Sequence, residues 1–120
     1  MKYRVVIESS ARHDIDAAYD WIKGRAPLAA IKWFNRVDDA IRSLARNPHR
    51  CVAAPESVEF EQDIRQLVHG RRAGRYRILF VVAAGTVHVL HVRHGAQRHL
   101  PRRPYDGRRR SVSITDDGRA

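Results

Sequence analysis

The spacing of apolar positions changes early in the chain from every second residue to every third or fourth. Residues 2–8 place Tyr, Val and Ile on one face of an extended segment, which predicts a half-buried strand. Residues 11–23 then carry an apolar stripe at helical spacing, which predicts an amphipathic helix. Ser9 and Ser10 precede this helix as candidate N-caps, and Gly24 follows it as the residue expected to end it.

A second helical stripe covers residues 28–46. Pro27 stands where a helix can begin, and Asn47-Pro48 stands where it should close. The apolar positions again recur every three or four residues: Ala30, Trp33, Phe34, Val37, Ala40, Ile41 and Leu44. Because only a few residues join the two helices, the pattern predicts an antiparallel helical hairpin.

The second half of the chain returns to strand character. Three runs rich in β-branched and aromatic residues, 64–68, 75–82 and 87–94, are separated by turns that contain glycine. Short turns between such runs predict an antiparallel meander. Residues 49–63, which include Pro55 and four acidic residues, are predicted to be loop. The resulting order, β-α-α-β-β-β, is an α+β fold in which a helical hairpin packs on one face of a twisted, mainly antiparallel sheet.

Composition separates a folded domain from a tail. Residues 1–98 contain all the predicted elements, whereas residues 99–120 are rich in Arg, Pro, Gly, Ser and Asp, which predicts a basic, disordered tail. The single cysteine, Cys51, excludes an intramolecular disulfide and fits a reducing compartment. No signal-peptide pattern and no apolar run of membrane-spanning length occurs in the sequence. We therefore expect a cytoplasmic protein with no membrane partner.

The net charge of +10 is concentrated in the second half of the chain. Residues 1–63 hold ten basic and ten acidic residues, while residues 64–94 hold six arginines and no acidic residue. Clustered positive charge of this kind favours a polyanionic partner, such as RNA, DNA, the ribosome or an acidic protein. A general compositional bias towards arginine, without nucleic-acid binding, is the alternative that charge alone leaves open.

Several short motifs occur in the order found in a known protein family. They are Ala11-Arg12-His13-Asp14-Ile15, Ala30-Ile31-Lys32-Trp33, Ile64-Arg65-Gln66-Leu67, Tyr76-Arg77-Ile78-Leu79-Phe80, and Val89-Leu90-His91-Val92-Arg93-His94-Gly95. Over about residues 2–98 the chain thereby resembles the RelE/ParE superfamily of bacterial type II toxins, of the plasmid-stabilisation type. The resemblance implies a growth-arresting toxin that is neutralised by a cognate antitoxin, with which it forms a hetero-oligomer. Grooves lined by helices, or an edge of the sheet, are expected to accept an antitoxin helix or strand.

The resemblance leaves two modes of action open. ParE-like members poison DNA gyrase and need no catalytic residues, whereas RelE-like members cut mRNA on the ribosome without a metal ion. Departures from the RelE pattern at Gln66 and Gln97 favour the ParE-like mode. Whether the protein is an enzyme depends on this choice, because only the RelE-like mode makes it an endoribonuclease. An interpretation from another class is a non-toxic RNA- or DNA-binding module, whose binding would weaken steeply with salt.

Four residues are candidates for catalysis in the RelE-like mode. Arg65 and Arg77 match positions that bind phosphate in RelE-type members, and guanidinium groups suit bidentate contacts to phosphate oxygens. His94 or His91 would act as acid or base, because imidazole titrates near neutral pH.

Three further arginines, Arg75, Arg93 and Arg98, are candidate nucleic-acid contacts. If the helices cover the sheet face of Tyr76, strand alternation places Arg75 and Arg77 on an opposite face that is expected to stay open and concave. Arginines that merely keep such a face soluble are the alternative interpretation.

The histidines of the last predicted strand do not form a metal-binding pattern. His88, His91 and His94 recur every three residues, a spacing that puts neighbours on alternate faces of a strand. The sequence therefore predicts no metal site and no other cofactor.

Overall fold

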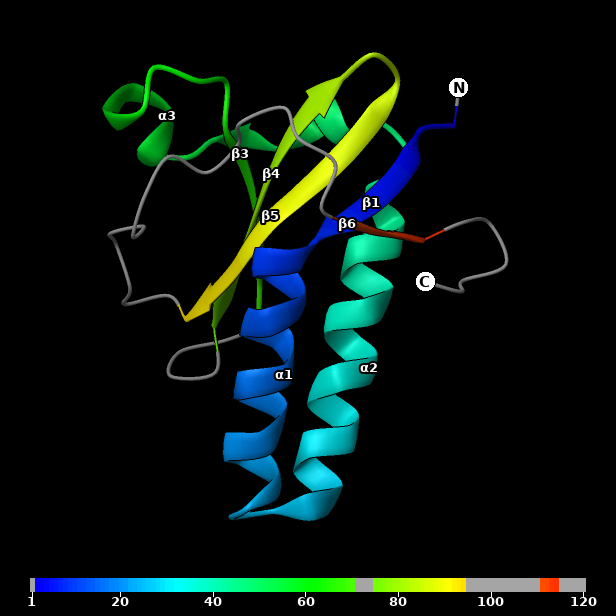
Figure 1. The fold of residues 1–120 in the computed structure, drawn as a ribbon, viewed down its shortest axis with the longest axis vertical. Coiled ribbons are helices and arrows are strands. Elements are labelled where there is room, and N and C mark those ends of the chain that lie inside the picture. The colour runs from blue at the N-terminus through cyan, green and yellow to red at the C-terminus, as the bar shows by residue number, and fades with distance from the viewer. Residues whose placement is uncertain (1, 71–74, 95–110, 115–120) are drawn as a thin grey trace.

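The computed structural model describes residues 2–70, 75–94 and 111–114, which form one sheet with a helical hairpin on one of its faces (Figure 1). In chain order the elements are β1 (Arg4–Glu8), α1 (Ser9–Lys23), α2 (Pro27–Ser43), the short 3-10 helix η1 (Pro48–Arg50), β2 (Val52–Ala53), α3 (Glu56–Glu59), β3 (Arg65–His69), β4 (Tyr76–Ala83), β5 (Thr86–His94) and β6 (Ser111–Ile114). The described strands lie in the order β2-β3-β4-β5-β1-β6. Strands β3, β4 and β5 form the antiparallel meander, and β1 lies parallel beside β5. The predicted α+β fold with a mainly antiparallel sheet is confirmed.

The helices begin and end close to the predicted residues, but α1 is capped differently. Its N-cap is Glu8, and no side chain caps the first turn. The Ser10 hydroxyl instead donates to the carbonyl oxygen of Leu90 at 2.6 Å, because α1 follows β1 without a loop and starts beside β5. The prediction of a serine cap was wrong, whereas the helix end at Gly24 is confirmed.

Helices α1 and α2 pack their apolar stripes against one face of the sheet. The buried residues of this core are Val5, Ile7, Ala11, Ile15, Val37, Ile41, Leu44, Cys51, Ile78, Phe80, Val87, Val89 and Val92. Tyr76 and Val82 of β4 pack against the same cluster. The helices therefore cover the face of β4 that carries Tyr76, which is the condition under which the sequence analysis placed Arg75 and Arg77 on the opposite face.

The opposite face of β4 is covered by residues 54–64, which we call the cover segment. This part of the predicted loop contains α3 and lies across the sheet. Its terminal residues Ala54 and Ile64 form a second buried cluster with Leu79 and Val81, each no more than 8% exposed. The prediction of an open concave face was therefore wrong, because a strand with apolar residues on both faces must be covered on both.

Part of the predicted disordered tail joins the sheet. Residues 111–114 form β6, antiparallel to β1, with Ser111 opposite Glu8 and Ile114 opposite Val5. This corrects the prediction of disorder for β6, whose Ser-Val-Ser-Ile sequence has the alternation of an edge strand. The other predicted tail residues lie outside the described part of the chain, so the boundary near residue 98 stays a prediction.

Deleting residues 111–120 should lower the melting temperature by several degrees. The deletion removes the backbone hydrogen bonds between β6 and β1, and each such bond contributes about 1 kcal/mol net. Thermal unfolding followed by circular dichroism measures the shift. If the truncated protein and the full chain had the same melting temperature, β6 would add nothing to the stability of the sheet.

Candidate functional site

The predicted phosphate ligand Arg77 lies in the sheet beneath the cover segment and is only 8% exposed. Its two terminal nitrogens donate to the two carboxylate oxygens of Glu56 at 2.9 and 2.6 Å, and one of them also donates to the side-chain oxygen of Gln66 at 3.0 Å. Glu56 comes from α3 and is 2% exposed. A buried bidentate pair of this kind compensates both charges and ties the cover segment to β4.

The surroundings of Glu56 keep its carboxylate ionised. Burial by itself would raise the pKa of Glu56, but the hydrogen bonds and charge of Arg77, a backbone hydrogen bond and the charge of Arg93 together outweigh burial, so the pKa is lowered. Arg93 is the cross-strand partner of Arg77 on β5. One buried carboxylate thus lies in the field of two guanidinium groups, and much of the positive charge at the centre of the sheet is compensated within the protein.

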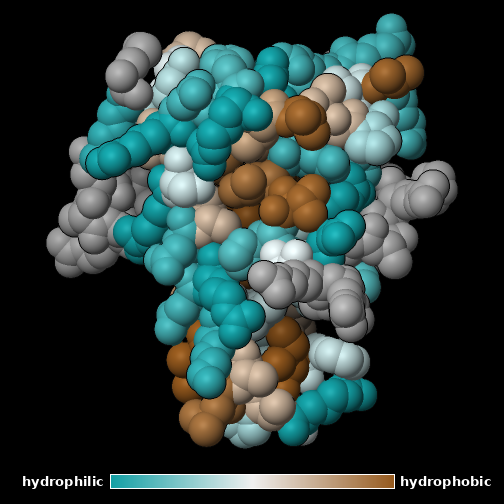
Figure 2. Space-filling model, turned by 180° about the vertical axis from the view of Figure 1, so that it is seen from behind, coloured by the Kyte–Doolittle hydropathy of each residue, from teal (hydrophilic) through white to brown (hydrophobic). Residues whose placement is uncertain are grey.

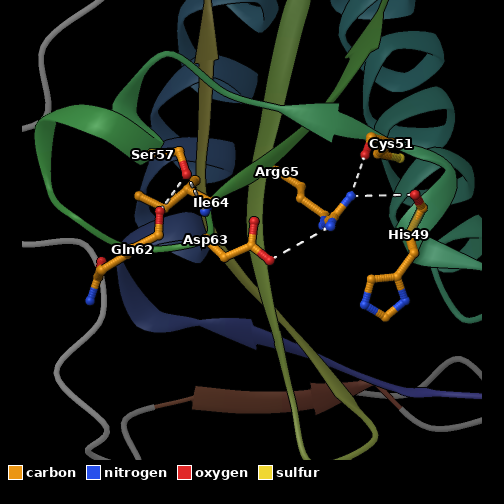
Figure 3. Close-up of polar contacts among 7 residues, drawn as sticks. All are labelled: His49, Cys51, Ser57, Gln62, Asp63, Ile64 and Arg65. Atoms are coloured by element: carbon orange, nitrogen blue, oxygen red, sulfur yellow. Dashed lines mark hydrogen bonds and ion pairs between the residues drawn. The ribbon is translucent and has the colours of Figure 1, made fainter.

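Arg65, the other predicted phosphate ligand, holds the chain around β2 in place (Figure 3). Its guanidinium donates to the carbonyl oxygens of Cys51 at 2.8 Å and His49 at 3.3 Å. It also lies 3.6 Å from the carboxylate of Asp63. Arg65 therefore acts as a structural bridge between β3 and the segment that precedes the cover.

Ser57 closes the cover segment on itself (Figure 3). Its hydroxyl donates to the carbonyl oxygen of Gln62 and accepts the backbone N–H of Ile64, the latter at 3.2 Å. These contacts satisfy backbone groups that no strand or helix pairs, so a segment with little regular structure keeps one shape.

His91 is turned against α1 and is 7% exposed. Its Nδ1 lies 2.8 Å from Oδ2 of Asp14, and the same oxygen accepts the backbone N–H of Val92 at 3.0 Å. A second pair, His88 with Glu8 at 2.9 Å, joins β5 to β1. Both histidines connect β5 to its neighbours in the fold.

The remaining candidates lie near the ends of β4 and β5 or outside the described residues. His94 packs edge-on against Tyr76, its cross-strand partner, with ring centroids 5.5 Å apart. His94 and Arg93 line a hollow of about 400 Å³ beside α1. Arg75 is exposed, and Arg98 lies outside the described part of the chain.

The described candidates do not converge on one phosphate site. Arg77 and Arg93 are cross-strand partners, but Arg65 is opposite Phe80, three residues further along β4, which corresponds to about 10 Å. Both Arg65 and Arg77 direct their donors to oxygens of the protein itself. The catalytic roles assigned in the RelE-like mode stay predictions, and this arrangement gives them no support.

Two acidic residues that the sequence analysis did not select hold this arrangement together. Glu56 pairs with Arg77, and Asp14 binds His91. A partial signal existed, because four acidic residues of segment 49–63 stand directly before a strand region with six arginines and no acid. Which of those carboxylates is buried follows only from the fold.

Within residues 2–70, 75–94 and 111–114, no three His, Cys, Asp or Glu side chains are grouped closely enough to hold a metal ion. The helices of the same part of the chain all lack the length or the apolar character needed to cross a membrane.

The chain is similar to known proteins in sequence and in fold. A family model described as the ParE toxin of type II toxin-antitoxin systems, parDE, matches residues 5–99. A solved structure of the chromosomal ParDE toxin–antitoxin system from P. aeruginosa has a similar fold, with a TM-score of 0.64 and 19% identity, covering 78% of this chain and 96% of that chain. No protein with a curated description matches significantly. Strand β6 lies beyond the residues matched by the family model.

Replacing Arg77 by Ala should cost about 3–5 kcal/mol of stability, because it leaves the carboxylate of Glu56 charged and unpaired in a buried site. This reverses the expectation for an exposed arginine, whose truncation would cost little. Replacing the pair together, Glu56→Leu with Arg77→Leu, should recover most of the loss, since neither charge is then left alone. Urea denaturation of the wild type, Arg77→Ala and the double variant measures the three free energies of unfolding.

The matched control is Arg75→Ala, an exposed arginine two residues away, which should change stability by less than about 0.5 kcal/mol. If Arg77→Ala were as mild as this control, the ion pair would not be what holds the cover segment on the sheet.

Acid should weaken the same pair. The pKa of Glu56 is lower in the folded protein than its ordinary value of 4.5. The contribution of the pair is therefore complete above the unfolded-state pKa and is lost as pH falls through the folded-state pKa. The difference in stability between the wild type and Glu56→Gln should be largest near neutral pH and shrink in acid. Urea titrations of the wild type and Glu56→Gln at neutral and at acidic pH measure this difference. A difference in stability that did not change with pH would contradict the lowered pKa of Glu56.

Proposed function

Because this chain belongs to the ParE toxin family of type II toxin–antitoxin systems, we propose that it arrests growth by poisoning DNA gyrase and not by cutting RNA. As the toxin of such a system it is neutralised by a cognate antitoxin. Family membership supplies the role of the protein, and the choice of target is inferred from the side chains of the sheet.

The observation that carries the proposal is the burial of Arg77. A phosphate clamp must present its guanidinium to the substrate, but both terminal nitrogens of Arg77 already donate to Glu56. Exchanging Glu56 for a phosphate would require the cover segment to leave the sheet and would strand a carboxylate that is 2% exposed. Breaking a buried pair in this way costs several kcal/mol, which disfavours RNA cleavage on this face.

The described residues also do not favour an acid or base for RNA cleavage. A general acid or base must come within hydrogen-bond reach of the reacting group, whereas His91 is 7% exposed and is bonded to Asp14. His94 is more accessible, but its neighbour in the sheet is the aromatic ring of Tyr76, and Arg65 is turned towards backbone carbonyls. These features support a toxin that acts by binding its target.

A strongly basic protein suits a target that works on DNA. The net charge of +10 favours encounter with the polyanionic complex of gyrase and DNA. Gyrase acts in the cytoplasm, which is therefore the proposed place of action. The proposed resting form is a hetero-oligomer with the antitoxin.

The purified toxin should inhibit supercoiling of relaxed plasmid by gyrase, and cleaved DNA should accumulate after detergent and protease treatment. Adding the antitoxin encoded beside this gene should restore supercoiling. In a parallel cell-free translation reaction, primer extension should show no ribosome-dependent cuts in mRNA. Ribosome-dependent cuts together with normal supercoiling would overturn the proposal and return Arg65 and His94 to consideration as RNA-cleaving residues.

A further inference from the structure

Strand β1 has two edges, and only one of them is paired within the part of the chain that matches the family model. On one side β1 lies parallel to β5, and on the other side it lies antiparallel to β6 (Figure 1). The family model matches residues 5–99, whereas β6 consists of residues 111–114. The strand that closes the β1 edge of the sheet is therefore an addition of this chain to the matched domain.

The backbone groups that β1 directs towards β6 follow from the register of the sheet. The N–H of Arg4 donates to the carbonyl oxygen just before β5 at 3.1 Å. Because successive residues of a strand direct their backbone groups to opposite edges, Val5 and Ile7 direct theirs to β6. Val5 is opposite Ile114, and Ile7 is opposite Val112. Without β6, the N–H and C=O groups of Val5 and Ile7 lose their partners, which is costly for backbone groups.

The uncapped edge would favour pairing with another chain. Its centre is Val5-Val6-Ile7, three β-branched residues that are no more than 7% exposed, and no proline or lysine interrupts the run. Proteins protect such edges with short or charged edge strands. Strand β6 has four residues, and in the sequence it follows three arginines, residues 108–110. It therefore replaces a strongly pairing edge by a weakly pairing one.

The sequence of β1 is complementary to itself in an antiparallel pair. If a two-fold axis passes between the Val6 residues of two copies, Val5 of each copy lies opposite Ile7 of the other, and Arg4 lies opposite Glu8. Apolar residues then meet apolar residues, and opposite charges face each other, which stabilises cross-strand pairs. The same backbone groups of Val5 and Ile7 that pair with β6 would pair with the second copy. Strand β6 itself demonstrates that a strand fits along this edge.

We propose that β6 is a built-in cap on a self-association surface, and that the edge of β1 binds the β1 edge of a second copy when β6 is displaced. Sixteen residues, 95–110, connect β5 to β6, and a tether of this kind gives an effective concentration of roughly millimolar. A second copy with a net charge of +10 is repelled instead. The intact chain therefore keeps its own strand on β1, and pairing between copies is suppressed. This inference does not depend on the target of the toxin.

Proline substitutions in the full-length chain test the cap. Val112→Pro removes a backbone N–H that β6 directs to β1, so the cap should be released. Ser113→Pro is the matched control, because the N–H of Ser113 points away from β1, where an edge strand tolerates proline. Sedimentation equilibrium should show a concentration-dependent dimer for Val112→Pro and monomers for Ser113→Pro and the wild type. Circular dichroism verifies the fold, and Ile114→Pro is the second releasing variant if Val112→Pro does not fold.

Further substitutions, made together with Val112→Pro, identify the surface that associates. Arg4→Glu brings like charges together at both ends of the paired strands and should weaken the dimer by roughly 10-fold. Lys2→Glu makes the same change of charge outside the paired residues and should not weaken it. Exposed apolar residues also gather at the far end of the helical hairpin (Figure 2), where Leu28 of α2 is 75% exposed. Leu28→Ser should leave the dimer unchanged, because this end of the hairpin is not the proposed interface.

A synthetic peptide with the sequence of residues 108–116 should return Val112→Pro to the monomer, because it occupies the same edge of β1. Added salt should strengthen the dimer, since it screens the repulsion between two basic chains. Folded Val112→Pro and Ile114→Pro proteins that both stay monomeric would overturn the proposal. A dimer that Leu28→Ser disrupts, or that neither Arg4→Glu nor the peptide weakens, would overturn it as well, because association would then use another surface.

Discussion

The pairing of Arg77 with Glu56 is the interaction on which the arrangement of the sheet depends. Strand β4 lies between β3 and β5 and carries apolar residues on both faces, so it needs a cover on each side. The helical hairpin provides one cover through a large apolar core. The other cover is only residues 54–64 with a single short helix, and it buries few apolar side chains. A buried ion pair is stable only in good geometry, because each charge would be costly to leave alone, and this requirement fixes the cover segment on the sheet.

The same pairing changes the meaning of the positive charge in the sheet. The arginines counted between residues 64 and 94 suggest a surface for nucleic acid. Arg77 is compensated by a carboxylate, and Arg65 by carbonyl oxygens and Asp63. The charges of Arg65 and Arg77 therefore stabilise the fold and are not presented to a partner. In the described part of the chain, Arg65 and Arg77 thus direct their donors to the protein itself, although the chain as a whole is strongly basic.

Helix α1 is fastened to the sheet over only part of its length. Its first half is fastened to β5 by the Ser10 hydroxyl and by the Asp14 carboxylate, which binds both His91 and a backbone amide. Its second half extends past the sheet and presents Trp21. The guanidinium of Arg25 lies 4.0 Å from the centroid of this exposed indole ring, a cation–π contact that stabilises its position.

The local pattern of the sequence determined the main elements, β1, α1, α2, β3, β4 and β5, and their order. These follow from periodicity, because a stripe every three or four residues or an alternation of two is visible within one segment. The motif order was enough to identify the superfamily. The sequence could not determine what covers the second face of β4, since apolar alternation shows that a face is buried and not which distant segment buries it. Residues 111–114 illustrate the same limit, because their strand depends on the free edge of β1, more than a hundred residues earlier in the chain. Tertiary structure alone decided the roles of the charged residues. Glu56 meets Arg77 across 21 residues and Asp14 meets His91 across 77, and whether a guanidinium or an imidazole serves folding or chemistry depends on the partner that folding brings to it.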